Sequence, residues 1–322
     1  GRITRWAAMA IKAKIYLFEG NWTQVKNITS TIMTEGGFKL FGSYAGLFEI
    51  ANEYNSEVIL DAQYRPTSRE HQMMYVFLPP TLGGYSQLSP LQELVDSYIM
   101  LDGKTIKETG TSFDESHPYA NRDPRLKATV MYTGNSYTLA DGTEVVINCE
   151  KGEGKDGYGV GSDCSATGYY IKKYWDNTYR ATLYSGLNPI LIRYADILLM
   201  NAEALAELGE LDKTAWDATI KPIRDRAGFT LASALEFPEG ASKDKLIEIV
   251  RNERRSELAL EGHRHKDIIR WRIADNVLNG WCHGLKTNDV VGTDDGYVRV
   301  ENRTFNANKH YLWPIPQAER DL

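Results

Sequence analysis

The chain has 322 residues, of which 42% are hydrophobic and 25% are charged, with a net charge of -6 and a pI near 5.6. This length and apolar content suffice for a large buried core in one or two domains. The acidic balance argues against binding of nucleic acid, which requires a basic face. No apolar run approaches the ~18 residues of a membrane-spanning helix, so we expect any membrane association to come from a lipid anchor or a partner.

The first predicted element is a helical hairpin. Apolar residues recur at helical spacing over residues 4–18, Gly20 interrupts the pattern, and a second helical pattern covers residues 22–35. We therefore assign residues 1–57 to a helical scaffold that also includes residues 190–271.

Residues 58–189 have a different character, with short predicted elements separated by long loops. We predict strands at residues 57–64, 126–132, 145–149 and 169–174 and a helix at residues 91–98. Binding sites usually lie on loops that a rigid scaffold supports. We therefore expect this region to bind the ligand.

A glycine motif in this region has an accidental match to a nucleotide-binding loop. Gly152, Gly154 and Gly157 have the spacing of the dinucleotide fingerprint, but the following sequence YGVGSDCSATG cannot form the helix that would hold a pyrophosphate. The chain also lacks the sequence motifs of common nucleophilic and zinc-dependent enzymes. We predict no cofactor and no catalytic residue. Cys149 and Cys164 could pair across a hairpin or remain free.

The middle region places aromatic residues beside polar ones. A sugar has a face of C–H bonds that packs on a flat ring, and hydroxyls that need carboxylates, amides or arginines. The four-residue group that follows the strand at 169–174 offers both kinds of contact, and two tyrosines in separate loops could add to it. The alternative is that these rings fill the core. The predicted ligand-binding residues are Tyr85, Tyr119, Trp175, Asp176, Asn177 and Tyr179.

A second helical hairpin follows the middle region. Helical spacing covers residues 194–208, Gly209 provides the turn, and a return helix covers residues 214–227 before Gly228. Both hairpins resemble tetratricopeptide units in their small residues, aromatics and turn glycines. Two units are too few for an independently stable solenoid, so they need neighbours such as the helix that ends near Gly262.

A charged helix comes next, in which carboxylates replace aliphatic residues on the inward face. The apolar stripe that precedes it continues at helical spacing into Glu253, Glu257 and Glu261. Arg254 lies three residues before Glu257, and Arg264 three after Glu261. Since arginines would hold these carboxylates ionised, we predict a packed ion network that fixes the scaffold rather than an acid–base pair.

The same helix contains histidines that invite a metal-binding interpretation. His263, His265 and Asp267 could each supply a ligand. Positions two apart lie on opposite sides of a helix and cannot converge on one ion, so we predict no metal site. Asp267 instead lies three residues from both Arg264 and Arg270, within reach of an ion pair.

The charged helix also carries a family motif, Glu253-Arg254-Arg255-x-Glu257-Leu258-x-x-Glu261-Gly262-x-Arg264-x-x-Asp267-x-x-Arg270-Trp271. This motif resembles the hallmark helix of the SusD/RagB family, the surface nutrient-binding lipoproteins of Bacteroidetes. Seven further segments resemble the family's motifs in the family's order, at residues 1–4, 102–104, 122–126, 168–173, 192–204, 223–228 and 313–319. Family members carry a lipoprotein signal and a long helical portion before the first of these blocks, and a tail after the last. We therefore expect this chain to be a piece of a longer protein.

The resemblance implies a function as well as a fold. It implies non-catalytic binding of an oligosaccharide or polysaccharide at the cell surface, and delivery to a SusC-like TonB-dependent transporter in the outer membrane. Two alternatives stay open. Some relatives bind oligopeptides, as RagB-like proteins do, and a surface glycoside hydrolase would need two carboxylates roughly 5–10 Å apart across a sugar site.

These observations predict a mostly α fold, in which tetratricopeptide-like hairpins pack against an irregular, loop-rich region with minor β structure. We expect one incomplete SusD-like domain over residues 1–322. Its expected parts are the helical scaffold at 1–57 and 190–271, the irregular ligand-binding region at 58–189 and an extended C-terminal segment at 272–322.

Overall fold

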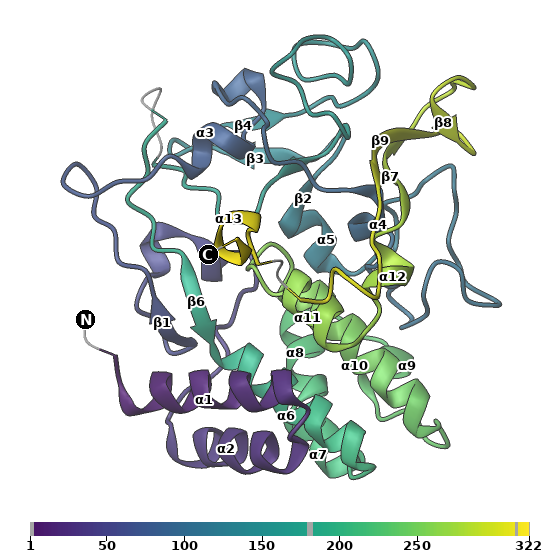
Figure 1. Cartoon of the computed structure of the whole chain (residues 1–322). Coiled ribbons are helices and arrows are strands. Elements are labelled where there is room, and N and C mark those ends of the chain that lie inside the picture. The colour runs from purple at the N-terminus through teal and green to yellow at the C-terminus, as the bar shows by residue number, and fades with distance from the viewer. Residues whose placement is uncertain (1–2, 179–182, 313–314, 322) are drawn as a thin grey trace.

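The structure, a computed structural model, describes residues 3–178, 183–312 and 315–321. It is mostly helical, with a few small sheets (Figure 1). Helical hairpins occupy one end of the molecule, and the irregular middle region and a C-terminal sheet occupy the other. The predicted fold class is confirmed.

The first hairpin consists of α1 (Arg5–Glu19) and α2 (Trp22–Glu35). The Thr4 hydroxyl accepts a hydrogen bond from the Ala7 backbone N–H and caps α1. Gly20 ends the helix with φ +72°, a left-handed conformation that suits glycine. The buried face of α1 is made of small residues and one leucine, which allow close packing against α2 and α6: Ala7, Ala10, Ala13 and Leu17.

The second hairpin consists of α6 (Tyr194–Leu208), α7 (Lys213–Ala218) and α8 (Ile220–Ala227). The prediction of a single return helix over residues 214–227 is wrong, because the helix is interrupted at Thr219 and forms α7 and α8. Pro222 explains the break, since it has no backbone N–H and its ring clashes with the carbonyl of residue 218 in a continuous helix. Gly228 ends α8 with φ +104°, as the sequence predicts.

The remaining scaffold helices are α9 (Ala232–Leu235), α10 (Lys243–Glu257) and α11 (Arg264–Arg270), and α12 (Ala274–Val277) follows at the start of the C-terminal segment. The helix predicted to end near Gly262 ends earlier, at Glu257. Leu260 and Gly262 both have positive φ, at +64° and +79°, which a right-handed helix cannot accommodate. α11 therefore runs in a new direction, and Glu261 lies in the turn between the two helices.

The middle region contains short helices and three two-stranded antiparallel sheets. Its helices are α3 (Met73–Phe77), η3 (Pro80–Leu82), α4 (Gln92–Val95) and α5 (Pro124–Thr129), and two short helices, η1 (Gly46–Phe48) and η2 (Ile50–Asn52), precede it. The sheets pair β1 (Val58–Asp61) with β6 (Ile190–Arg193), β2 (Val130–Met131) with β5 (Tyr170–Ile171), and β3 (Ser136–Thr138) with β4 (Glu144–Val146). The predicted strands at 57–64, 145–149 and 169–174 each overlap one of these shorter strands.

The predicted strand at residues 126–132 is wrong over most of its length. The Asp123 carboxylate accepts a hydrogen bond from the Arg125 backbone N–H, and Pro124 occupies the first helical position, so this segment begins as α5. Extended structure is restricted to β2. The predicted helix at 91–98 is present as the shorter α4.

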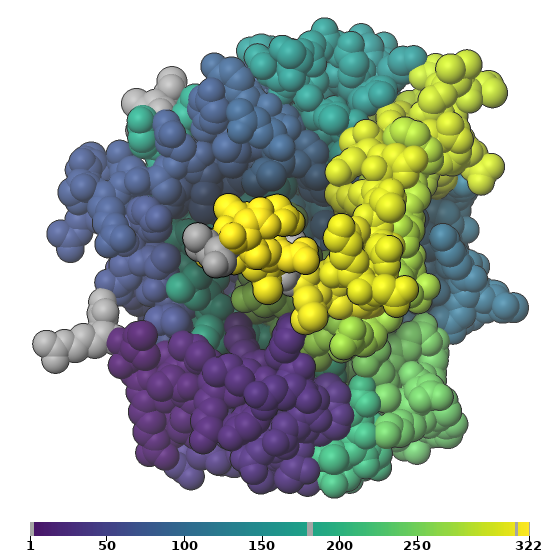
Figure 2. Space-filling view, viewed as in Figure 1, coloured from purple at the N-terminus to yellow at the C-terminus, as the bar shows by residue number. Residues whose placement is uncertain are grey.

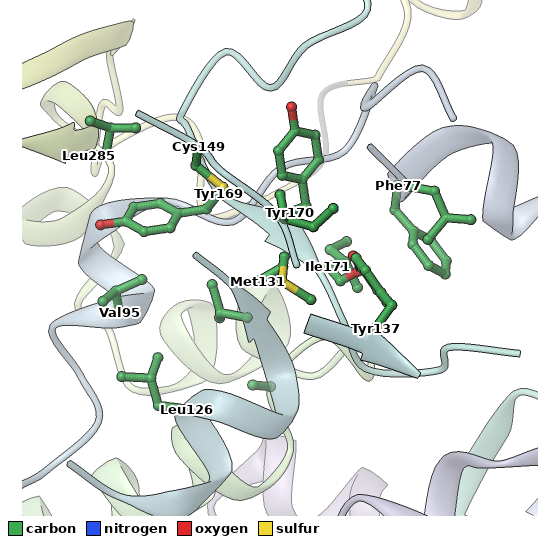
Figure 3. Packing of buried hydrophobic residues seen from close by; sticks show 14 of the residues in the cluster. Phe77, Val95, Leu126, Met131, Tyr137, Cys149, Tyr169, Tyr170, Ile171 and Leu285 are labelled. Carbon is green, nitrogen blue, oxygen red and sulfur yellow. The ribbon is translucent and has the colours of Figure 1, made fainter. Parts of the chain in front are cut away.

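The core of the middle region surrounds β2 and β5. Tyr170 and Ile171 pair with Met131 and Val130 and are buried with them. Figure 3 shows the Tyr169 ring on the side of Val95 and Leu285, so this core continues to the C-terminal sheet. Cys149 is buried in the same cluster, and neither it nor Cys164 forms a disulfide.

The C-terminal segment contains a three-stranded antiparallel sheet that the sequence analysis did not predict. Its strands are β7 (Gly280–Lys286), β8 (Thr293–Asp294) and β9 (Tyr297–Arg303), in the order β7-β9-β8, and α13 (Gln317–Arg320) follows. A signal for it exists, since Asp295 and Gly296 form a turn with positive φ between β8 and β9. In Figure 2 this sheet, in yellow, lies against the teal middle region.

Candidate functional site

Buried ion pairs connect the helical scaffold to the middle region. The two oxygens of Glu253 bind different arginines, Arg125 at 2.6 Å and Arg224 at 2.7 Å. Glu257 contacts three arginines: Arg125 at 2.9 Å, Arg193 at 2.6 Å and Arg226. All of these side chains are buried away from water, so each charge is stabilised mainly by its oppositely charged partners.

The predicted ion network is present, but most of the partners inferred from helical spacing are wrong. Arg254 pairs with Asp196 at 2.7 Å and with Asp267 at 2.9 Å rather than with Glu257. Within the described residues, Arg264 forms no ion pair. The spacing gives the right partner for Asp267 and Arg270, which lie 2.9 Å apart.

The arginines determine the charge state of the carboxylates. Burial raises the pKa of a carboxyl, but the arginines outweigh it and hold the pKa values of Glu253 and Glu257 below their usual range. Arg193 and Lys173 likewise lower the pKa of Glu261 to about 2, against the effect of burial. These groups are ionised at neutral pH and cannot donate a proton, which favours their role as scaffold.

A cleft of about 1120 Å³ opens between the middle region and the C-terminal sheet. Segments far apart in the chain line it, including residues 113, 115–120, 148–151, 168–169 and 285–289. Its aromatic lining residues are Phe113, Tyr119, Tyr169 and Tyr297. The cleft therefore combines flat rings with polar groups on loops that the scaffold supports, as ligand sites generally do.

Tyr119 is held in the cleft by other aromatic residues. Its ring stacks on Tyr132, with the centroids 3.9 Å apart and the planes inclined by 16°. Its hydroxyl lies 3.3 Å from that of Tyr169, which in turn donates to Gln92 Oε1 at 2.5 Å. Burial raises the pKa of Tyr119 to about 12, so the hydroxyl remains protonated. Tyr119 thus offers a fixed ring with a polar edge.

Arg122 supports the loop that carries Phe113 and Tyr119. Its guanidinium donates to the backbone carbonyls of Pro118, Val95 and Tyr98, at 2.7 Å for the shortest bond to each. It also lies over the Phe113 ring, 5.5 Å from the centroid. Its donors are therefore engaged by the protein, and Arg122 positions the cleft wall.

The opposite wall comes from the C-terminal sheet and is joined to the loops by ion pairs. Lys286 Nζ lies 2.7 Å from Glu115 and 5.4 Å from the centroid of the Tyr297 ring. Lys151 pairs with Asp289. Both pairs are solvent-exposed and contribute little stability individually, but they engage one lysine on each side of the cleft.

His283 attaches the same sheet to α4. Its Nδ1 lies 2.8 Å from Glu93, and its Nε2 lies 3.0 Å from Asp294, which also binds Arg299. Partial burial lowers the pKa of His283, but hydrogen bonds to Asp294 and Glu93 outweigh it and raise the pKa above 6.5. The imidazolium therefore connects two segments that enclose the cleft.

This contact predicts a pH dependence of the C-terminal sheet. Because the pKa of His283 is raised on folding, its stabilising contribution is present below pH ~6.5 and is lost as pH rises through the folded pKa. We expect amide hydrogen exchange in β7 to accelerate over that range, beyond the intrinsic effect of pH. His283→Gln should abolish this extra acceleration, whereas an unchanged pH profile in the variant would show that another group is responsible.

The structure places Tyr119 and Tyr85 in different surroundings. Tyr119 lines the cleft. Tyr85 stacks on Tyr75, with the ring centroids 4.3 Å apart, and is 39% exposed. Among the described residues, Tyr85 is not part of the cleft lining, so its role in ligand binding stays a prediction.

Trp175 is partly buried against the middle core. Its ring lies 5.0 Å from that of Tyr137, and its Nε1–H donates to the Thr138 carbonyl at 2.9 Å. The described lining of the cleft does not include Trp175. Replacing it would therefore disturb packing as well as any ligand contact.

The polar neighbours of Trp175 are organised by the loop itself. Asp176 is buried, and its two oxygens accept hydrogen bonds from Thr178 and from the Ser185 hydroxyl. Asn177 is half-buried beside it. Tyr179 lies outside the described residues. The predicted contacts of this group with a ligand stay predictions.

Phe113, Tyr297 and Lys286 line the cleft but are not among the predicted ligand-binding residues. Phe113 is an isolated aromatic residue in a loop, and no local pattern distinguishes it. Tyr297 directly follows the Asp295-Gly296 turn, so recognition of that hairpin could have drawn attention to it, and Lys286 of β7 pairs with Tyr297 in the sheet.

Comparison with known proteins identifies the fold family. The sequence model that describes the SusD family matches residues 46–322, which is most of the chain. The chain belongs to the SusD family. It is 28% identical to SusD-like protein P25 of Formosa agariphila, over 86% of this chain and 51% of that protein.

Solved structures of SusD-like proteins extend this similarity to the whole fold. A SusD-like carbohydrate binding protein from Bacteroides fragilis superimposes with a TM-score of 0.86 and 30% identity, over 100% of this chain and 64% of that one. A second SusD-like protein from the same organism gives a TM-score of 0.79 and 28% identity, with coverages of 99% and 63%. This chain spans about half the length of the curated SusD-like relatives. Over the described ranges, no helix has both the length and the apolar character needed to span a bilayer.

Proposed function

We propose that this chain binds an oligosaccharide or polysaccharide at the cell surface without cleaving it, and passes it to a SusC-like TonB-dependent transporter. The observation that carries this proposal is the similarity of the entire chain to the carbohydrate binding protein from B. fragilis. We further propose that the complete protein is a lipoprotein on the outer membrane, as the family assignment suggests.

The cleft supports a carbohydrate ligand by its chemistry. Phe113, Tyr119 and Tyr297 are half-buried rings that can pack against the C–H faces of sugars. Asn148 and Asn288 are exposed on the lining and can bind hydroxyls as donors and acceptors. We propose Tyr119 as the central contact because its ring is fixed by Tyr132 before any ligand arrives.

A product assay distinguishes binding from hydrolysis. A glycosidase needs one carboxylic acid that donates a proton and a second carboxylate across the sugar. In the cleft, Glu115 and Asp289 are each engaged by a lysine, whereas Glu150 and Glu153 form no ion pair within the described residues. Analysis of the products after incubation with a bound glycan tests this directly, since any shortening of the chain would show catalysis.

The proposal predicts a large effect of removing the Tyr119 ring. We expect Tyr119→Ala to weaken binding of the preferred oligosaccharide at least about tenfold, the loss typical of a central aromatic contact. Tyr119→Phe retains the ring and should bind much more tightly than Tyr119→Ala. Isothermal titration calorimetry against oligosaccharides and oligopeptides measures both effects.

Two further variants locate the site. Tyr54→Ala removes a tyrosine that is 67% exposed and lies outside the cleft lining, and it should bind normally. Trp175→Ala tests the alternative aromatic group. If Tyr119→Ala binds normally while Trp175→Ala loses affinity without unfolding, the site lies at Trp175. Binding of peptides alone would contradict the proposed carbohydrate ligand.

A further inference from the structure

The charged lining of the cleft has an excess of carboxylates. Its cations are Arg122, Lys151 and Lys286, and its carboxylates are Asp96, Glu115, Glu150, Glu153 and Asp289. With histidine neutral, the described lining therefore has a negative net charge. An anionic ligand entering the cleft would be repelled by this local excess.

The cations of the cleft are already engaged by the protein. Arg122 donates to three backbone carbonyls. Lys286 pairs with Glu115, and Lys151 pairs with Asp289. A sulfate or carboxylate that captured either lysine would leave the former partner carboxylate unpaired beside the ligand, so the exchange would increase repulsion within the same site.

Carboxylates in the cleft remain available to a ligand that donates hydrogen bonds. Glu150 and Glu153 are exposed, and within the described residues their carboxylates form no ion pair or hydrogen bond. An ionised carboxylate is an acceptor and has no hydrogen to donate, so it suits the hydroxyls of an uncharged sugar. It cannot satisfy an anionic group.

We propose that the cleft selects an uncharged, hydroxyl-rich glycan and discriminates against glycans that carry carboxylates or sulfate esters. This inference rests on the proposed glycan-binding function and specifies the chemical class of its ligand. The rings of Phe113, Tyr119 and Tyr297 bind the sugar faces, and the surplus carboxylates accept hydroxyl hydrogens and exclude acidic substituents.

Matched pairs of glycans that differ only in charge test the proposal. The probes are neutral oligosaccharides of glucan, mannan and galactan type, each compared with its derivative in which C6 hydroxymethyl groups have been oxidised to carboxylates. For every neutral glycan that binds the chain, we expect the oxidised derivative to bind at least tenfold more weakly in calorimetry. Added sodium chloride should leave the neutral affinity nearly unchanged and should partly restore that of the oxidised form, because salt screens repulsion.

A charge reversal in the cleft provides the matched variant. Glu153→Lys should reduce the preference for the neutral form over the oxidised form. Glu239→Lys changes the net charge by the same amount at an exposed position outside the cleft lining, and it should keep the original preference. An equal reduction by both variants would show that net charge, and not the cleft, sets the preference, and would overturn the inference.

The outcomes separate this inference from the function on which it rests. Equal or tighter binding of oxidised glycans, with loss of binding in Tyr119→Ala, would overturn the charge selectivity and leave glycan binding at the cleft intact. Failure of every neutral and oxidised glycan to bind would contradict the proposed function, and the inference would fail with it.

Discussion

Glu257→Gln is expected to lower the free energy of unfolding by about 3–5 kcal/mol, the usual effect of removing one partner from a buried ion pair. The substitution keeps the side-chain volume but removes the charge that compensates Arg125, Arg193 and Arg226. These arginines come from three different segments, so repulsion among them should loosen the junction of the scaffold and the middle region. Denaturant unfolding monitored by circular dichroism measures the change.

Arg264→Gln is the control for this prediction. Arg264 belongs to the same family motif, but within the described residues it forms no ion pair, and its guanidinium carbon lies 5.9 Å from the centroid of the Trp271 ring. Arg264 is half-buried. We expect a loss of about 1 kcal/mol, within the usual range for a single cation–π contact. Equal destabilisation by Arg264→Gln and Glu257→Gln would contradict the assignment of the buried network as the main electrostatic support.

The same network predicts how stability responds to acid. The pKa values of Glu257 and Glu261 are lower in the folded protein than the usual 4.5, so both groups favour folding above that pH. Their contribution is lost as pH falls through the folded values, toward about 2 for Glu261. We expect wild-type stability to fall steeply below pH ~4.5, and Glu257→Gln to have a shallower slope over the same range. Equal slopes would show that other carboxylates control acid unfolding.

The helical part of this fold is predictable because its signals are local. Gly20, Gly209 and Gly228 each end a helix at the predicted position, with positive φ. The carboxylate stripe of α10 is equally visible in the sequence. Its arginine partners are not, because Arg125 and Arg193 approach Glu257 from segments more than sixty residues away. Helical spacing offered the nearer but incorrect Arg254.

The cleft is much less predictable from the sequence. The position of Tyr119 in a loop predicts it as a site residue. Phe113 and Tyr297 line the same cleft only because the C-terminal sheet packs against the middle region. That sheet has a weak strand signal, since β7 includes Gly280 and Gly284. Long-range packing, rather than residue type, creates the site.

Gly284→Ala is expected to separate the two walls of the cleft. A Cβ at Gly284 would lie 2.6 Å from the Thr167 carbonyl oxygen and 2.8 Å from its Cα, both backbone atoms that cannot rotate away. The adjacent Leu285 N–H donates to the same carbonyl at 2.7 Å, and this bond should be strained or broken. Overpacking of this kind costs about 1–3 kcal/mol, and β7 should move away from Gly168 and Tyr169.

The expected signs of this movement are a lower melting temperature, faster hydrogen exchange at the Leu285 amide and weaker binding of the oligosaccharide that the wild type prefers. Gly161→Ala is the matched control, because its added Cβ would meet no atom within 4 Å and its φ is not positive. It should match the wild type in all three measurements. Glycan affinity depends on β7 only if Lys286 and Tyr297 line the ligand site. A Gly284→Ala variant with a mobile Leu285 amide but unchanged glycan affinity would therefore place the ligand elsewhere, most directly at Trp175.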